Sequence, residues 1–194
     1  MVVFAPGYDY EDYPEGRKSL TIEEMIDAFD QSFRIWHLNI AHQVVKIPDS
    51  GFAVLSLLNP YFEMIARHYL GLTSEESKRK TGKLHAEGVK IVFPNLANSP
   101  EIAQEVSDLL YDAVRCSVAH MGLTGTGIFL SETRYQHALT VHFDANNKVA
   151  MLGIHPPLWV KTISDHFAEY ISLLRNPQNQ ERRNLFSKCF TSPF

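Results

Sequence analysis

The sequence predicts a mainly α-helical protein, an antiparallel helical bundle with a small antiparallel β-hairpin or sheet near its C-terminal end. Apolar residues recur at intervals of three and four over most of the chain, which is the period of an amphipathic helix. That period is lost between about residues 127 and 155, where short alternating segments and turn residues predict strands. The 194 residues, 45% of them hydrophobic and 21% charged, suit one compact domain with a substantial core.

The first long helix is expected to begin after Thr21, its N-cap, and to end before Pro48. Glu24 follows Thr21 at the spacing of a capping box. The apolar stripe of this helix consists of Ile22, Met25, Ile26, Phe29, Phe33, Trp36, Ile40 and Val44. Its aromatic members are expected to belong to the core rather than to a platform on which nucleic-acid bases stack.

A second helix, rich in leucine and phenylalanine, is expected from residue 51 to Gly71, because a glycine commonly ends a helix. Pro60 should kink this helix or separate two shorter ones, since proline has no backbone N–H to donate. The segment from Thr73 to Lys90 is expected to be a third helix with Ser74 as its cap. Because few of its residues are apolar, we expect it to lie on the surface.

The later elements are expected to be one long helix, three short strands and two more helices. Ser99 followed by Pro100 predicts a helix start, because proline at the first position lacks only an N–H that has no helical partner. This helix should run to about Met121. The strands are expected at residues 127–130, 137–143 and 148–154, the last two as a hairpin, and the final helices at residues 158–174 and after Pro177.

The expected organisation is an N-terminal extension over residues 1–19, the bundle over residues 20–176 with its β insert at about residues 127–155, and a short C-terminal helix and tail over residues 177–194. Residues 1–16 contain no basic n-region, so no secretory signal is expected. Polar and charged residues interrupt the most apolar stretch, whereas a membrane span needs about 20 apolar residues. We therefore expect a soluble cytoplasmic protein that does not bind membranes.

Charge and cysteine content argue against two classes of protein. The chain has 18 Lys and Arg against 22 Asp and Glu, a net charge of −4. It is not expected to coat DNA, because such binding needs a broad basic surface. Cys116 and Cys189 are far apart and form no CxxC motif, so neither a disulfide framework nor a thiolate zinc site is expected. A reducing compartment suits this chain best.

Arg115 and His120 stand near the end of the helix that begins after Ser99. A guanidinium can hold a phosphate through two hydrogen bonds, and an imidazole titrates near neutral pH. On a helix, the two residues lie roughly 140° apart and about 7.5 Å apart along the axis. A purely structural interpretation also exists: Arg115 can pair with Asp112, and the helix dipole favours His120 in the last turn.

The segment VRCSVAHMGL, which contains this pair, resembles the signature of the HEPN superfamily, an Arg and a His separated by four to six residues. Weaker resemblance extends to NPYFEMIARHYLG and to HPPLWVKTISDHFAEYISLL. Cys116 stands where many members carry Asn, Asp or His. The resemblance implies a HEPN-like helical bundle that commonly dimerises. It further implies that Arg115 and His120 are the catalytic pair of a metal-independent endoribonuclease, a toxin, a defence protein or an RNA-processing enzyme.

The implied reaction is attack of a ribose 2′-OH on the adjacent phosphate, which yields a 2′,3′-cyclic phosphate and a 5′-OH. His120 would move a proton, and Arg115 would hold the phosphate oxygens as charge develops. One imidazole cannot act as base and acid in the same step, so a homodimer with two such pairs in one cleft is expected. The reaction requires no metal ion and no cofactor. Further expected partners are RNA and an antitoxin or nucleotidyltransferase.

Two basic clusters could follow an RNA backbone, although a solvated helix face is the ordinary interpretation of such clusters. The first cluster, the candidate substrate-binding site, is Lys78, Arg79, Lys80 and Lys83, and the second is Arg182, Arg183 and Lys188. The histidine pairs His37/His42 and His137/His142 do not have zinc-ligand spacing, and the glycines of residues 122–127 indicate a turn.

Two alternatives to an enzyme stay open. The first is a non-catalytic HEPN-like module that binds a nucleotide, RNA or a protein. The second is a helical scaffold whose inserted hairpin provides an edge for interaction.

Overall fold

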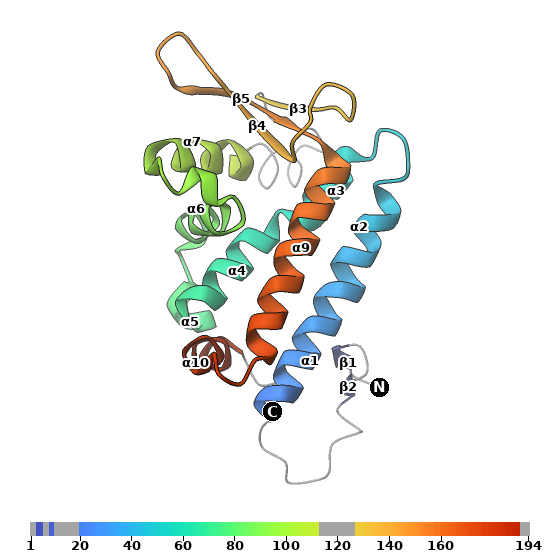
Figure 1. Ribbon diagram of the computed structural model, residues 1–194, viewed down its shortest axis with the longest axis vertical. Helices are drawn as coiled ribbons and strands as arrows, with labels where there is room; N and C mark the ends of the chain where they lie inside the picture. The colour runs from blue at the N-terminus through green and yellow to red at the C-terminus, as the bar shows by residue number, and fades with distance from the viewer. Residues whose placement is uncertain (1–2, 6–7, 10–19, 113–126, 191–194) are drawn as a thin grey trace.

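The computed structural model describes residues 3–5, 8–9, 20–112 and 127–190. The protein is mainly helical, and a small three-stranded sheet lies over one end of the helices (Figure 1), which confirms the predicted fold class at this level. The described helices are α1 (Ile22–Phe33), the π-helical η2 (Arg34–Leu38), α2 (Asn39–Val44), α3 (Gly51–Leu58), α4 (Pro60–Leu70), α5 (Ser74–Ser77), α6 (Thr81–Val92), the 3-10 turn η3 (Pro94–Leu96), α7 (Pro100–Leu110), α9 (Pro156–Arg175) and α10 (Gln180–Cys189). The strands are β1 (Val3–Ala5), β2 (Tyr8–Asp9), β3 (Ile128–Leu130), β4 (Leu139–Phe143) and β5 (Val149–Ile154).

The first long helix is continuous through α1, η2 and α2 and begins as the sequence predicts. The Thr21 hydroxyl accepts a hydrogen bond from the Glu24 N–H at 3.3 Å, and the Glu24 carboxylate accepts one from the Thr21 N–H at 2.8 Å. This capping box satisfies N–H groups that would otherwise have no partner in the first turn. The helix ends at Val44, before Pro48, as predicted.

The π-helical segment η2 changes which residues face the core. Its i→i+5 hydrogen bond, from the Asn39 N–H to the Arg34 carbonyl, adds one residue to a turn, so positions beyond it lose their phase with α1. Phe33 is buried, whereas Trp36 and Ile40 are each 43% exposed. The prediction that Trp36 belongs to the core is therefore wrong, because a stripe read at a constant helical period cannot anticipate the extra residue.

The second predicted helix is two helices, α3 and α4, with Pro60 opening the second of them. Gly71 ends α4 in the left-handed region, at a φ of 63°. A side chain at this position would be strained by the backbone, and its Cβ would lie 2.5 Å from the Leu185 side chain. Both the division at Pro60 and the stop at Gly71 agree with the sequence-based predictions.

The third predicted helix is corrected in three respects. It is divided into α5 and α6, because Lys78 leaves the helical region and Arg79 has a positive φ of 65°. Its cap is Thr73, not Ser74. It is also not a surface helix: α6 packs closely on α4, and a Cβ at Gly88 would lie 1.9 Å from the Phe62 carbonyl oxygen. Glycine permits a close approach that a count of large apolar residues does not register.

The sheet is mixed, with strand order β3-β5-β4. The β4–β5 pair is the predicted antiparallel hairpin, but β3 runs parallel to β5. The expectation of an antiparallel sheet is thus correct for the hairpin only. The connection after β3 crosses to the far side of β5, and this crossing makes the two strands parallel.

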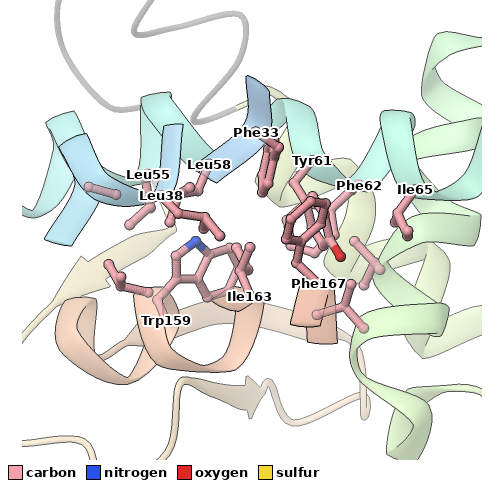
Figure 2. Packing of buried hydrophobic residues seen from close by; sticks show 14 of the residues in the cluster. Phe33, Leu38, Leu55, Leu58, Tyr61, Phe62, Ile65, Trp159, Ile163 and Phe167 are labelled. Atoms are coloured by element: carbon pink, nitrogen blue, oxygen red, sulfur yellow. The ribbon is translucent and has the colours of Figure 1, made fainter. Parts of the chain in front are cut away.

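Helix α9 lies among α1, α2, α3 and α4, and its inward side chains form much of the core (Figures 1 and 2). The fully buried Trp159 contacts Phe62 edge-on at 5.5 Å between ring centroids, and Phe167 lies 4.6 Å from Phe33. The His155 Nδ1 atom caps α9 by accepting from the Leu158 N–H at 3.3 Å. Within the described residues, no helix has the length and apolar character needed to cross a membrane.

Candidate functional site

The predicted catalytic residues Arg115 and His120 lie outside the described residues, as do Cys116 and residues 122–126. The structure does describe the helix that leads to them. Helix α7 runs to Leu110, and the backbone remains helical at Tyr111, four residues before Arg115. Tyr111 and Asp112 are the described residues that precede Arg115 most closely in the sequence.

Tyr111 lies against the start of α6. Its phenol oxygen is 3.2 Å from the hydroxyl oxygen of Thr81, and its ring meets the ring of His85 edge-on at 5.5 Å between centroids. These contacts join the end of α7 to the first residues of α6. The start of α6 in turn follows directly on the predicted RNA-binding cluster.

His85 forms a buried polar chain between α4 and α7. Its Nδ1 atom is 2.9 Å from the Ser107 hydroxyl oxygen, and its Nε2 atom is 3.2 Å from the Asn59 Oδ1 atom. Burial lowers the pKa of His85 to about 4, so the ring is neutral at pH 7. Because Asn59 Oδ1 can only accept, Nε2 donates to it, and Nδ1 accepts from the Ser107 hydroxyl.

The hydrogen bonds link a serine to a histidine and the histidine to an asparagine, as in the catalytic triad of some hydrolases. The three side chains differ from such a triad because they are not accessible to solvent. Ser107 is 1% exposed, His85 is 0% exposed and Asn59 is 2% exposed. A nucleophile must reach its substrate, and the Ser107 hydroxyl does not reach solvent. These hydrogen bonds therefore help to fix the relative positions of α4, α6 and α7. No sequence pattern indicated this set of hydrogen bonds, since Asn59, His85 and Ser107 come together only when three helices pack.

The predicted RNA-binding cluster forms the turn between α5 and α6 and the first residues of α6. Lys78 bonds to Glu75, which neutralises one of the four charges locally. Arg79, Lys80 and Lys83 are exposed, and none of them pairs with a described acidic group. The positive φ of Arg79 closes the turn, so that three cations are presented beside Thr81.

A hollow of about 260 Å³ adjoins this turn. It is lined by Pro60, Glu63, Met64 and Arg67 of α4 and by Ser77, Thr81 and Leu84. The Arg67 guanidinium is held in place by the carbonyl oxygens of Leu72, at 3.0 Å, and Cys189, at 2.7 Å. The lining of the hollow therefore carries one positive charge, that of Arg67, and one acidic side chain, Glu63, and it lies next to the turn with the exposed cations.

The second predicted basic cluster has internal roles. Arg183 is buried and donates to the Leu174 carbonyl oxygen and to Glu23. Arg182 stacks on the Tyr69 ring at 4.0 Å, and Lys188 pairs with Glu76. The interpretation as a solvated basic face is wrong for Arg183, which is buried, whereas Lys188 is exposed and forms a surface ion pair with Glu76.

The histidine pairs also have packing roles. His42 Nε2 lies 3.0 Å from the Ser164 hydroxyl oxygen, whereas His37 stacks on Phe33. His142 meets Tyr135 edge-on. Over the part of the chain that the structure describes, no group of three histidine, cysteine or acidic side chains is placed to hold a metal ion.

No family model, no curated protein and no solved structure matches this chain.

Proposed function

We propose that the protein is a HEPN-type endoribonuclease, built on a HEPN-like antiparallel bundle, that uses Arg115 and His120 to cleave RNA without a metal ion. The observation that best supports this proposal is the contact of Tyr111 with Thr81. Thr81 directly follows the turn that carries the exposed Arg79 and Lys80, and Tyr111 precedes Arg115 by four positions in the sequence. An RNA strand bound at the motif would pass this turn, where Arg79, Lys80 and Lys83 can neutralise its phosphates.

In the proposed reaction, one imidazole removes the proton from a ribose 2′-OH, and the 2′ oxygen forms a bond to the adjacent phosphorus. The bond from phosphorus to the 5′ oxygen breaks, and a second imidazole protonates the leaving oxygen. Arg115 stabilises the charge on the non-bridging oxygens. Two imidazoles require two copies of His120, so the proposal includes a two-fold homodimer.

The first test is incubation of the purified chain with a mixed RNA in EDTA. We expect products ending in a 2′,3′-cyclic phosphate and a 5′-OH, and loss of cleavage by at least about a hundredfold in Arg115→Ala and His120→Ala. His137→Ala changes a histidine that lies outside the motif and serves as the control. RNA left intact by the wild-type chain, or cleavage that persists in both motif variants, would refute the nuclease.

A second experiment tests whether the exposed cations of the α5–α6 turn, Arg79, Lys80 and Lys83, here called the basic turn, bind the substrate. Changing Arg79, Lys80 and Lys83 together to alanine should raise KM and weaken the salt dependence of RNA binding, with little change in kcat. Lys161→Ala removes an exposed cation on α9 and should leave KM and the salt dependence of RNA binding unchanged. Light scattering tests the homodimer.

The basic turn also favours a second candidate, a non-catalytic HEPN-like module that binds RNA. In that case RNA would bind in a salt-dependent manner, require the same three cations and remain intact. If the protein is the proposed endoribonuclease, we further propose that it is a toxin or defence protein with an antitoxin or nucleotidyltransferase as its partner. Inhibition of cell growth that depends on Arg115 and His120 would support this setting.

A further inference from the structure

Strand β3 forms one edge of the three-stranded sheet. It pairs with β5, and the bonds that flank the pair run from the Leu152 N–H to the Gly127 carbonyl at 2.7 Å and from the Ser131 N–H to the Ile154 carbonyl at 3.0 Å. Backbone groups of successive strand residues alternate in direction. The N–H and C=O groups of Ile128 and Leu130 therefore point away from β5, and no described residue bonds to them.

A half-open hollow of about 490 Å³ follows this edge. It is lined by Asp49, Ser50, Gly51 and Phe52 at the start of α3, by residues 128–132, and by Pro156 at the start of α9. Ile128 and Leu130, whose outward backbone groups have no described partner, are both among its lining residues. Phe129 is 51% exposed at the rim. The lining of the hollow thus combines strand residues whose outward backbone groups have no partner among the described residues with apolar side chains.

The charge of the hollow is negative. Asp49 and Glu132 line it, both are exposed, and neither pairs with a described cation. None of the described lining residues is basic. The first turn of α3 contributes the partial positive charge of a helix N-terminus, about half an elementary charge, which two carboxylates outweigh.

We propose that the β3 edge binds an extended peptide segment of a partner protein, with an apolar residue flanked by lysine or arginine. The segment adds to β3 as a further strand and bonds to the outward groups of Ile128 and Leu130. Its apolar side chain enters the hollow beside Phe52, and its cations face Asp49 and Glu132. Edge strands without charged or proline residues are ready templates for such pairing. The two carboxylates disfavour RNA here, so this site is separate from the basic turn and does not depend on cleavage.

The test uses the full chain and a heptapeptide that carries fluorescein on its N-terminal amine, fluorescein-Lys-Val-Thr-Ile-Thr-Val-Lys-amide. In fluorescence anisotropy at low salt, we expect this peptide to bind at least tenfold more tightly than its counterpart with glutamate at both ends. Strand pairing uses every second amide. Methylation of one alternate set of peptide nitrogens should therefore abolish binding, whereas methylation of the other set should preserve it.

The double variant Asp49→Asn with Glu132→Gln should bind the lysine peptide about tenfold more weakly. Asparagine accommodates the positive φ of 60° at residue 49, so the turn is retained. Glu101→Gln, which removes an exposed carboxylate in the first turn of α7, is the matched control and should bind like the wild type. Circular dichroism verifies that both variants are folded.

Several outcomes would overturn the proposal. They are equal binding of the lysine and glutamate peptides, equal effects of the two methylation patterns, unchanged affinity in the double variant, and the absence of binding. A dimer that Phe129→Lys dissociates would assign this edge to a second copy of the chain instead.

Discussion

His85 and His68 are both buried, but their surroundings differ. Both ring nitrogens of His85 have hydrogen-bond partners, supplied by α4 and α7. His68 packs between aromatic rings, with centroids 4.6 Å from Phe29 and 5.3 Å from Phe186, and its buried Nδ1 atom has no described partner. Burial, assisted by the charge of Arg67, lowers the pKa of His68 to about 3.

The two histidines therefore mark two kinds of helix contact, one that requires particular residues and one that tolerates substitution. Where α4, α6 and α7 meet, hydrogen bonds and the close approach at Gly88 demand particular residues. Where α1, α4 and α10 meet, aromatic surfaces fill space. Each region has a buried polar atom without a described partner, Asn59 Nδ2 in the first and His68 Nδ1 in the second, so the two regions differ in the hydrogen bonds of His85 and in the close approach at Gly88. We therefore expect substitutions in the first region to cost more than substitutions of similar size in the second.

The largest effect is expected for Gly88→Ala. The new Cβ would lie 1.9 Å from the Phe62 carbonyl oxygen, and because this neighbour is backbone, α4 and α6 must separate. We expect a loss of at least about 3 kcal/mol in the free energy of unfolding, measured by urea denaturation. Gly82→Ala in the same helix meets no atom within 4 Å and should stabilise the protein by up to about 1 kcal/mol. Similar values for the two variants would contradict a close α4–α6 contact.

His85→Leu should cost about 2 kcal/mol, because it leaves the buried polar groups of Ser107 and Asn59 without their partner. Urea denaturation at pH 7 measures this loss. Adding Ser107→Ala should recover part of it, since one of the stranded groups is then removed. If Ser107→Ala instead lowers the free energy of unfolding further, the hydrogen bond between His85 and Ser107 does not stabilise the protein as described.

The smallest effect at pH 7 is expected for His68→Phe, within about 0.5 kcal/mol of the wild type, because an aromatic ring replaces one whose Nδ1 is unsatisfied. In the unfolded chain histidine has a pKa near 6.5, whereas the pKa of folded His68 is about 3. Below pH 6.5 the unfolded state therefore takes up a proton that the folded state does not, and stability falls. Each such histidine contributes at most about 1.4 kcal/mol per pH unit.

Between pH 6.5 and 4.5, His68→Phe should remove the contribution of His68 to the fall in the free energy of unfolding with decreasing pH. The contribution of His85 should remain. Unfolding measured at pH 7, 5.5 and 4.5 gives the comparison. An unchanged slope would mean that His68 takes up its proton without unfolding.

Local features were predicted well because they depend on residues near one another in the chain. The capping box at Thr21, the break at Pro60, the stop at Gly71 and the β4–β5 hairpin each follow from backbone chemistry within a few positions. The same analysis selected Arg115 and His120 by their spacing and by resemblance. Their catalytic role stays a prediction, since both lie outside the described residues.

Tertiary packing decided the remaining features. The phase change at η2 exposes Trp36, α6 is buried through Gly88, β3 is parallel to β5, and Arg183 points inward. Each depends on which surface another element presents, and no pattern within one segment contains that information. For the same reason, only the packed helices bring the start of α6, directly after the α5–α6 turn, against Tyr111. Only the assembled sheet leaves Ile128 and Leu130 of β3 without a backbone partner among the described residues, next to an acidic hollow.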